Sequence, residues 1–406
     1  MSKIYKYLEH YAESEIQALK DFPTQLSFNN VVVIPAYNES VLFLQRYMAS
    51  TLSTAANLLI LVINQPTSEQ HSTSQQQLES AALESGQIIW KKRNLCLIKL
   101  NQGQGYLLAI DRFTTGHQIN DKQGVGLARK IGADVATALI HNNIIKSPWI
   151  CSTDADTHLP DNYFTSLDAG PSNVAALLYS FKHIDHQDDI SKATLIYEKA
   201  LRYYVSGLAW AGSHYAFHTI GSTLAVHYNY YAMVRGFPKR SAGEDFYLLN
   251  KLAKLAPIHT ITQSTLNIEP RISTRVPFGT GPAVEKILQL PSIEDYRYYH
   301  PSLFLELKNC LQAMTQLWHY KDQLQSWLAL LSPSSQQALT QLNISKLFEH
   351  IQNNIKSPEQ CINHVHQWFD AFRTLKFFHY QQQQFFPKTP LSQGIKNAPF
   401  VIDQSF

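Results

Sequence analysis

Two carboxylates one residue apart, Asp154 and Asp156, are the side chains of this sequence best suited to chemistry. They follow the apolar run Trp149–Thr153, which predicts a buried β-strand. In an extended chain, residues i and i+2 point the same way, so both carboxylates can face one cation. Oxygen ligands suit Mg²⁺ or Mn²⁺, which keep positions open for substrate phosphates. The pair alone is a weak signal, because acidic pairs at strand ends are common.

Alternating strands and helices are expected to position these carboxylates. The alternation predicts an α/β domain whose mixed, mostly parallel sheet is flanked by helices. Ligands of such sheets bind beyond the carboxyl ends of the strands, where Asn38, Glu39 and Asn64 fall with the two aspartates. The predicted strands are Val31–Pro35, Leu58–Ile63, Leu95–Leu100 and Trp149–Thr153, and Ala128–Asn142 is the clearest helix between them.

The flanking segments have a different character. Residues 1–27 are predicted to hold an amphipathic helix from about Ile4 to Leu19, and residues 28–285 form the α/β domain. Leucine, phenylalanine and tryptophan at helical spacing predict a helical appendage over residues 286–406, with an extended tail over its last 25 residues. The segment 101–123 is an insertion that the pattern does not assign.

Composition excludes several classes of protein. The 406 residues are 45% hydrophobic and carry a net charge of only +3, which does not favour a nucleic-acid partner. The four cysteines are scattered, which is typical of reduced thiols, and we expect a cytoplasmic protein. No apolar stretch reaches the length of a membrane span, although peripheral contact with a membrane is left open.

Four segments together resemble a known family. They look like motifs of the family 2 glycosyltransferases of the GT-A fold, and they occur in the family's order within residues 28–285. They are the opening strand Val31–Glu39, the glycine-flanked Ala-Arg segment Gly124–Gly132, the metal motif Asp154-Ala155-Asp156, and the acceptor-side segment Arg235–Pro238 followed by Gly243–Phe246 with its Glu-Asp pair.

The resemblance implies a metal-dependent, inverting and non-processive glycosyltransferase. Such an enzyme moves a sugar from a nucleoside-diphosphate sugar to a hydroxyl of a soluble or peripheral acceptor. The implied cofactor is Mn²⁺ or Mg²⁺, with Asp156 as direct ligand and Asp154 sharing the metal or the donor ribose. Asp245 is the implied base for the acceptor hydroxyl, and Glu244 is expected to position the acceptor or a loop.

The resemblance also implies a set of donor contacts. Pro35, Ala36, Tyr37 and Glu39 are expected to line the nucleotide cleft together with Asn64. Arg129 is expected near the nucleobase, and Arg275, in the loop Ile272–Gly281, near the diphosphate. His259 is expected to complete the metal shell, as a histidine does in some relatives. Ordinary structural roles for Arg129, the loop and His259 stay open.

One departure from the family concerns the donor base. The family's second strand usually ends in an acidic turn whose aspartate reads the base, whereas here it ends in Asn64-Gln65-Pro66. Two other classes of function therefore remain as alternatives. One is a non-catalytic relative that binds nucleotide sugars. The other is a nucleotidyltransferase of the same architecture, although the glycine-rich loop expected after its first strand is replaced by Ala36–Glu39.

Overall fold

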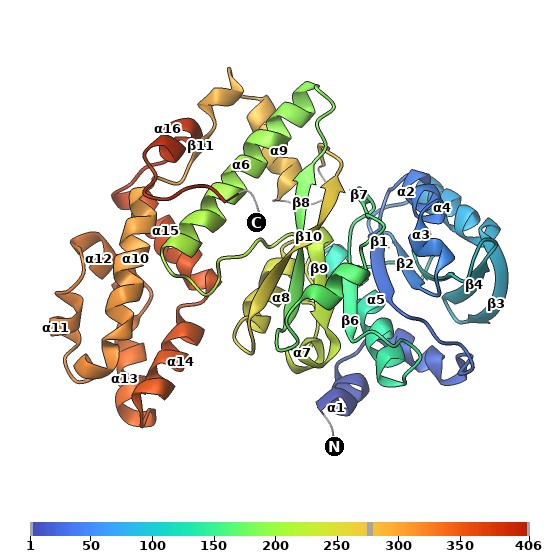
Figure 1. Ribbon diagram of the computed structural model, residues 1–406, viewed down its shortest axis with the longest axis horizontal. Coiled ribbons are helices and arrows are strands. Elements are labelled where there is room, and N and C mark those ends of the chain that lie inside the picture. Colours follow the sequence, from blue (N-terminus) through green and yellow to red (C-terminus); the bar gives the residue numbers. More distant parts are fainter. Residues whose placement is uncertain (1–2, 274–278, 404–406) are drawn as a thin grey trace. The chain divides into compact units, whose positions relative to one another are not determined.

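The structure is a computed structural model that describes residues 3–273 and 279–403. The chain forms two compact units, both drawn in Figure 1. The first comprises Met1–His186 and Thr219–Pro282, and the second comprises Gln187–His218 and Ala283–Phe406. The domain boundaries drawn from the sequence, after residues 27 and 285, stay a prediction.

A ten-stranded mixed sheet is the centre of the first unit, in the order β3-β4-β5-β2-β1-β6-β9-β8-β10-β7. Its central strands β5, β2, β1 and β6 are mutually parallel, and this confirms the predicted α/β class. The strands are β1 Val31–Ala36, β2 Leu58–Asn64, β3 Gly86–Lys92, β4 Leu95–Leu100, β5 Tyr106–Arg112, β6 Trp149–Ser152, β7 Thr157–His158, β8 Ala176–His183, β9 Leu224–His227 and β10 Ile258–Ile268.

Helices cover both faces of the sheet, which is why β1 and β2 are buried along their whole length. The helices of this unit are α1 Lys3–His10, α2 Leu42–Met48, α3 Thr51–Thr54, α4 Thr73–Glu84, α5 Gly124–His141, α7 Tyr228–Met233 and α8 Glu244–Leu252, with 3₁₀ turns η1 Ser14–Asp21, η2 Thr165–Ala169 and η3 Gly221–Thr223. Val32 packs in one core with Phe43 of α2 and Leu78 of α4. On the other face, a Cβ at Gly132 of α5 would lie 2.3 Å from Cγ1 of Val33.

A buried polar cluster attaches the N-terminal helix α1 to α5. The Asp134 side chain is fully buried, and it accepts hydrogen bonds from the hydroxyls of Tyr7 and Tyr231. Lys130 lies 2.8 Å from the same carboxylate, and the backbone N–H of Glu13 donates to it at 2.8 Å. Every polar atom of this carboxylate is thus satisfied, which removes most of the cost of burying it. The cluster thus fixes α5 at Lys130, and Arg129 is the residue that precedes Lys130 in this helix.

The second unit is helical. Its core joins α6 to the C-terminal helices through buried aromatic side chains such as Tyr203, Phe304 and Phe378. Its elements are α6 Asp189–Trp210, α10 Ser302–Thr315, α11 Leu324–Leu328, α12 Pro333–Gln341, α13 Ile344–Asn354, α14 Pro358–Trp368, α15 Ala371–Gln384 and α16 Leu391–Lys396, with η4 Ile293–Asp295, η5 Leu317–Tyr320 and the paired strands β11 Arg297–Tyr298 and β12 Thr389–Pro390. Helix α9, Thr280–Leu288, begins in the first unit and ends in the second.

Two sequence predictions of local structure were wrong, and one segment that the sequence left unassigned forms a strand. The helix expected from Ile4 to Leu19 is divided into α1 and η1. The unassigned insertion 101–123 contains β5, a central strand, because its apolar residues pair with β2 on one side and β4 on the other. The last 25 residues are not an extended tail, since they hold α16, whose Leu391 is buried in the helical core.

Two further observations concern membrane-spanning helices and the cysteines. Within residues 3–273 and 279–403, no helix has the length and apolar character needed to cross a membrane. All four cysteines are buried free thiols.

Candidate active site

The carboxyl ends of β1 and β6 bring two of the predicted segments together. The two strands are parallel neighbours, so Tyr37, Asn38 and Glu39 leave the sheet at the same edge as Asp154 and Asp156. Both aspartates are partly accessible, with 29% of the Asp154 side chain and 15% of the Asp156 side chain exposed. This edge therefore carries a concentration of negative charge that a ligand can reach.

Arg129 joins the first aspartate to the Glu-Asp pair. It is 3% exposed, and its guanidinium contacts a carboxylate oxygen of Asp154 at 2.5 Å and one of Glu244 at 2.8 Å. A third donor reaches the Ser152 hydroxyl at 2.9 Å. Burial lowers the pKa of Arg129, but the charges of Asp154 and then Glu244 outweigh it and raise the pKa above its ordinary value. The ordinary structural role left open for Arg129, that of a solvated arginine on a helix, does not fit this buried ion pair.

Glycine lets the first turn of α5 approach the loop before α8. The backbone N–H of Gly126 donates to the Arg240 carbonyl at 2.9 Å. A Cβ at Gly126 would lie 2.5 Å from the carbonyl oxygen of Pro238, which a side chain cannot tolerate. This close contact sets Arg129 opposite Glu244 at the start of α8.

Asp245 lies in the first turn of α8. Gly243, just before the helix, adopts the left-handed conformation with φ 71°, which glycine allows without strain. Part of the Asp245 side chain is accessible, but desolvation of its carboxyl, followed by the charge of Glu244, raises its pKa to about 7. A carboxylate that titrates near neutral pH is suited to accept a proton.

Arg271 pairs with the second aspartate, a contact that the sequence did not predict. Its guanidinium contacts Asp156 at 2.7 Å and both oxygens of Glu39 at 2.8 and 3.1 Å. Burial lowers the pKa of Arg271, but Asp156 and Glu39 together raise it overall. The only sequence signal was its place just after β10, since its partners come from distant segments. The arginine that the sequence did single out, Arg275, lies outside the described residues.

Glu269, the residue that follows β10, supports the Asp156 loop. Its backbone N–H donates to the Asp156 carbonyl at 2.9 Å. Its two carboxylate oxygens each lie 2.7 Å from a histidine Nε2, one of His158 and one of His186. Burial works to raise the pKa of Glu269, but the hydrogen bonds from His186 and His158 lower it below its ordinary value. None of these three residues was predicted from the sequence.

His259 is not brought to the carboxylates. It is exposed near the start of β10, whereas the Asp156 loop contacts Glu269, just beyond the other end of that strand. Ten residues of strand span roughly 30 Å, so His259 is far beyond the reach of a shared metal ion. Three of the predicted donor contacts are buried within strands, where they form part of the sheet: Pro35 and Ala36 in β1 and Asn64 in β2.

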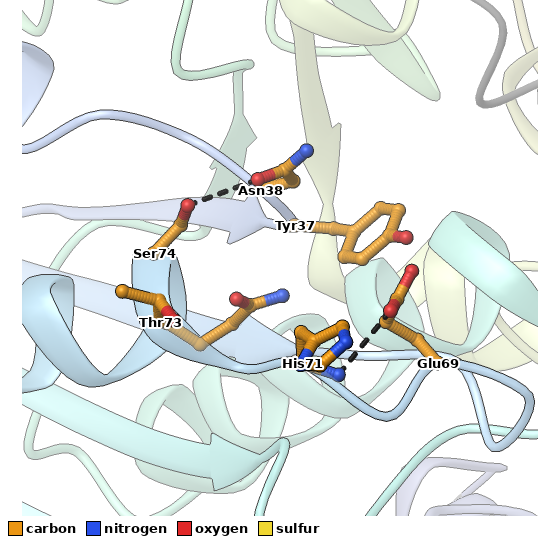
Figure 2. Close-up of a pocket in the computed structure, with 7 residues that line it drawn as sticks. Tyr37, Asn38, Glu69, His71, Thr73 and Ser74 are labelled. Atoms are coloured by element: carbon orange, nitrogen blue, oxygen red, sulfur yellow. Dashed lines mark hydrogen bonds between the residues drawn. The ribbon is translucent and has the colours of Figure 1, made fainter.

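A small open pocket adjoins the acidic edge (Figure 2). It lies beyond the ends of β1 and β2 and has a volume of about 180 Å³. Figure 2 shows Tyr37, Glu69 and His71 on one side of it and the Asn38–Ser74 hydrogen bond on the other. Thr73 and Gln75 complete the lining, and Tyr37 is the predicted cleft residue that lies here.

The donor atoms at the acidic edge suit a hard divalent cation. Among the residues that the structure describes, no group of three or more His, Cys, Asp or Glu side chains converges to hold a metal. A complete protein cage is not required, because Mg²⁺-type ions are commonly held by one or two carboxylates together with substrate phosphates and water. Asp154 and Asp156 can supply those oxygens, although each now has an arginine partner.

Comparisons with known proteins find likeness only among solved structures. No protein-family model matches the chain, and a search of curated proteins finds no match. One similar structure is the mannosyltransferase PcManGT from Pyrobaculum calidifontis in complex with GDP-Man and Mn²⁺. It is 13% identical, the match covers 89% of this chain and 93% of that chain, and the TM-score is 0.38.

A second similar structure is GalNAc-T7 with UDP, GalNAc and Mn²⁺. It is 11% identical, the match covers 89% of this chain and 59% of that chain, and the TM-score is 0.34. Both TM-scores lie below 0.5, so the function of this chain is argued from its own residues.

Proposed function

We propose that this chain is a glycosyltransferase that moves a sugar from a nucleoside-diphosphate sugar to a hydroxyl of an acceptor. The observation that carries the proposal is the pairing of Arg129 with both Asp154 and Glu244. This arginine joins Asp154 to Glu244, the neighbour of Asp245, so the strand-end aspartates and the Asp245 carboxyl would form one site although they are far apart in the sequence. A donor-binding group and a proton acceptor side by side are what sugar transfer requires.

Asp156 and Asp154 are the residues that would hold Mn²⁺ or Mg²⁺. When bound, the cation acts as a Lewis acid that stabilises the charge developing on the leaving diphosphate. Arg271 pairs with Asp156, so a cation held by this carboxylate would take the place of the Arg271 guanidinium there. The guanidinium of Arg271 then becomes available to the diphosphate, for which its paired N–H donors are well suited.

Asp245 would act as the general base. The acceptor oxygen forms a bond to the anomeric carbon while the bond from that carbon to the diphosphate oxygen breaks, and the hydroxyl proton passes to Asp245. Glu244 is buried and held by Arg129, so it is not free to attack the sugar as a nucleophile. A single displacement without an enzyme-bound sugar inverts the anomeric configuration.

The non-catalytic alternative is favoured by one observation. Both strand-end aspartates carry an arginine partner, as in a site that binds nucleotide sugars without a metal. The two proposals differ in donor hydrolysis, since only a catalytic site would pass the sugar to water when the acceptor is absent.

The decisive experiment measures binding and hydrolysis together. Nucleotide sugars are titrated into the protein with and without Mn²⁺ by calorimetry, and released nucleoside diphosphate is then followed. We expect metal-dependent binding and slow hydrolysis, both abolished in Asp156→Ala and both retained in Asp168→Ala, which removes an exposed carboxylate elsewhere in the same unit.

The other outcomes are equally informative. Metal-independent binding without hydrolysis would support the non-catalytic alternative. Failure to bind any nucleotide sugar, with or without a divalent cation, would refute the proposed function.

A further inference from the structure

The loop that follows β2 is held rigidly by hydrogen bonds. Gln65 is 1% exposed, and its side-chain amide donates to the Glu69 carbonyl at 2.9 Å. The backbone N–H of Thr67 donates to the Ile119 carbonyl at 2.9 Å. The Asp121 carboxylate accepts from the Thr67 hydroxyl and the Ser68 N–H, both at 3.2 Å. A loop fixed in this way presents its side chains without the entropy cost of ordering them on binding.

The Glu69 carboxylate is held in the pocket by this loop. One of its oxygens accepts the backbone N–H groups of Gln70 and His71 at 3.1 and 3.2 Å. Within the part of the chain that the structure describes, its second oxygen accepts no hydrogen bond. A carboxylate offers about four acceptor positions, so two stay available to a ligand. The pocket thus contains a fixed, charged acceptor suited to a pair of N–H donors.

The rest of the pocket supplies donors and flat surfaces. The Asn38 side-chain oxygen accepts from the Ser74 hydroxyl at 3.0 Å, which leaves the Asn38 NH₂ group as a donor. Gln75 is 3% exposed, lines the pocket, and takes part through its side chain in none of the described hydrogen bonds. Tyr37 and His71 contribute rings on which a planar ligand can stack.

We propose that this pocket binds the guanine base of a guanosine-diphosphate sugar, with Glu69 accepting the N–H donors of the base edge. The inference rests on the proposed function and names the donor for it. At about 180 Å³, the pocket is smaller than the roughly 300–1,000 Å³ of a site that encloses a drug-sized ligand, so it fits a base rather than a whole donor. Glu69 thereby takes the place of the base-reading aspartate that Asn64-Gln65-Pro66 lacks.

The other bases match this pocket less well. Guanine presents two neighbouring donors, the ring N1–H and the exocyclic NH₂, beside the carbonyl acceptor O6. Uracil presents one N–H between two carbonyl oxygens, so the second acceptor position of Glu69 would face an oxygen. Adenine and cytosine place a ring-nitrogen acceptor beside their amino group, which the carboxylate repels. Specificity in this pocket therefore comes from repulsion of the wrong bases as well as attraction of the right one.

The experiment compares the diphosphates of guanosine, inosine, uridine and adenosine, each titrated into the full chain with Mn²⁺ by calorimetry. Inosine lacks only the exocyclic NH₂ of guanosine. We expect the guanosine compound to bind most tightly, and the inosine compound about tenfold more weakly or worse, because one hydrogen bond to a charged acceptor is lost.

Glu69→Gln tests the residue itself. Glutamine keeps an oxygen for the backbone N–H groups of the loop but loses the charge, so guanosine diphosphate should bind about tenfold more weakly and the guanosine-to-inosine ratio should approach one. Glu84→Gln is the matched control, since it removes the same charge from an exposed position of the adjoining helix α4. A thermal melt of each variant checks that it is folded.

The results separate the two proposals. Tighter binding of uridine or adenosine diphosphate would overturn the guanine assignment and leave the transferase proposal standing. Equal binding of the guanosine and inosine compounds by the wild-type chain would overturn the role of Glu69, whatever happens to the variant. If no nucleoside diphosphate binds at all, both the base assignment and the proposed function fail.

Discussion

Replacing Arg129 with methionine should destabilise the first unit strongly. Methionine roughly keeps the volume of the side chain but removes its charge. The Glu244 side chain is then left buried beside Asp154 without its cation, at 5% exposure. Removing one partner of a buried ion pair typically costs about 3–5 kcal/mol. The Asp154 side chain is 29% exposed and solvent screens it, so we assign most of the expected loss to Glu244.

A double-mutant cycle tests the physical reason. In Arg129→Met/Glu244→Gln no buried charge is left unpaired, so this variant should recover about 1–3 kcal/mol relative to the sum of the two single changes. Hydrogen exchange of the slowest amides of α5 measures the free energy of opening in the unit that contains Arg129, separately from the helical unit. Arg93→Met, at an exposed position of the same unit, should change this free energy by about 0.5 kcal/mol or less.

The reasoning fails under either of two results. If Arg129→Met lowers the free energy of opening by less than about 1 kcal/mol, burial of the unpaired Glu244 carboxylate is not costly when Arg129 is absent. Strict additivity of the two single changes would mean that Arg129 and Glu244 do not act as a pair.

Three other changes test the site and the sheet. Asp245→Asn should slow transfer by about 10²–10⁴, and wild-type transfer should rise as pH increases through about 7, where the base ionises. The pKa of Asp245 in the folded state lies above its ordinary value of 3.8, so ionisation of this carboxyl lowers the stability of the wild type as the pH rises from about 4 to 7. Asp245→Asn should therefore melt at a higher temperature than wild type at pH 8, but not at pH 4. Arg271→Met should tighten binding of Mn²⁺ alone, measured by electron paramagnetic resonance, since it removes the ion pair between Arg271 and Asp156. Unchanged binding would show that this ion pair does not compete with the metal. Gly132→Ala should lower the melting temperature of the first unit, because the added Cβ would lie 2.3 Å from Val33, and an unchanged melt would contradict that contact.

The central strands could be predicted because their signal is local. β1 and β2 are continuous apolar runs, and such runs occur where helices cover both faces of a parallel sheet. β5 was missed because it lies among glycines and polar residues that are typical of a loop, and its pairing with β2 and β4 makes it a strand. The division of the N-terminal helix is also set by distant contacts, since the backbone N–H of Glu13 turns to Asp134.

The site residues also divide into those with a local sequence signal and those defined only by contacts with distant segments. Motifs that are contiguous in sequence, such as Asp154-Ala155-Asp156, could be recognised before their partners were known. Arg271 and Glu269 could not, because an isolated arginine or glutamate after a strand has no distinctive pattern. Their partners, Glu39 and His158, are more than 100 residues away. The pocket carboxylate Glu69 could not be recognised either, because it lies in a polar stretch without a distinctive motif.

The buried contact of Tyr7 with Asp134 and Tyr231 has a consequence for synthesis on the ribosome. Tyr7 of α1 is made before both of these partners, which lie 127 and more than 200 residues further along the chain. At about 5–20 residues per second, Tyr231 is made roughly 10–45 s after Tyr7. Until α5 has been made, α1 lacks its Asp134 partner, and until α7 has been made, it lacks Tyr231 as well. Helix α1 can therefore complete its packing only after the much later helix α7 has been made.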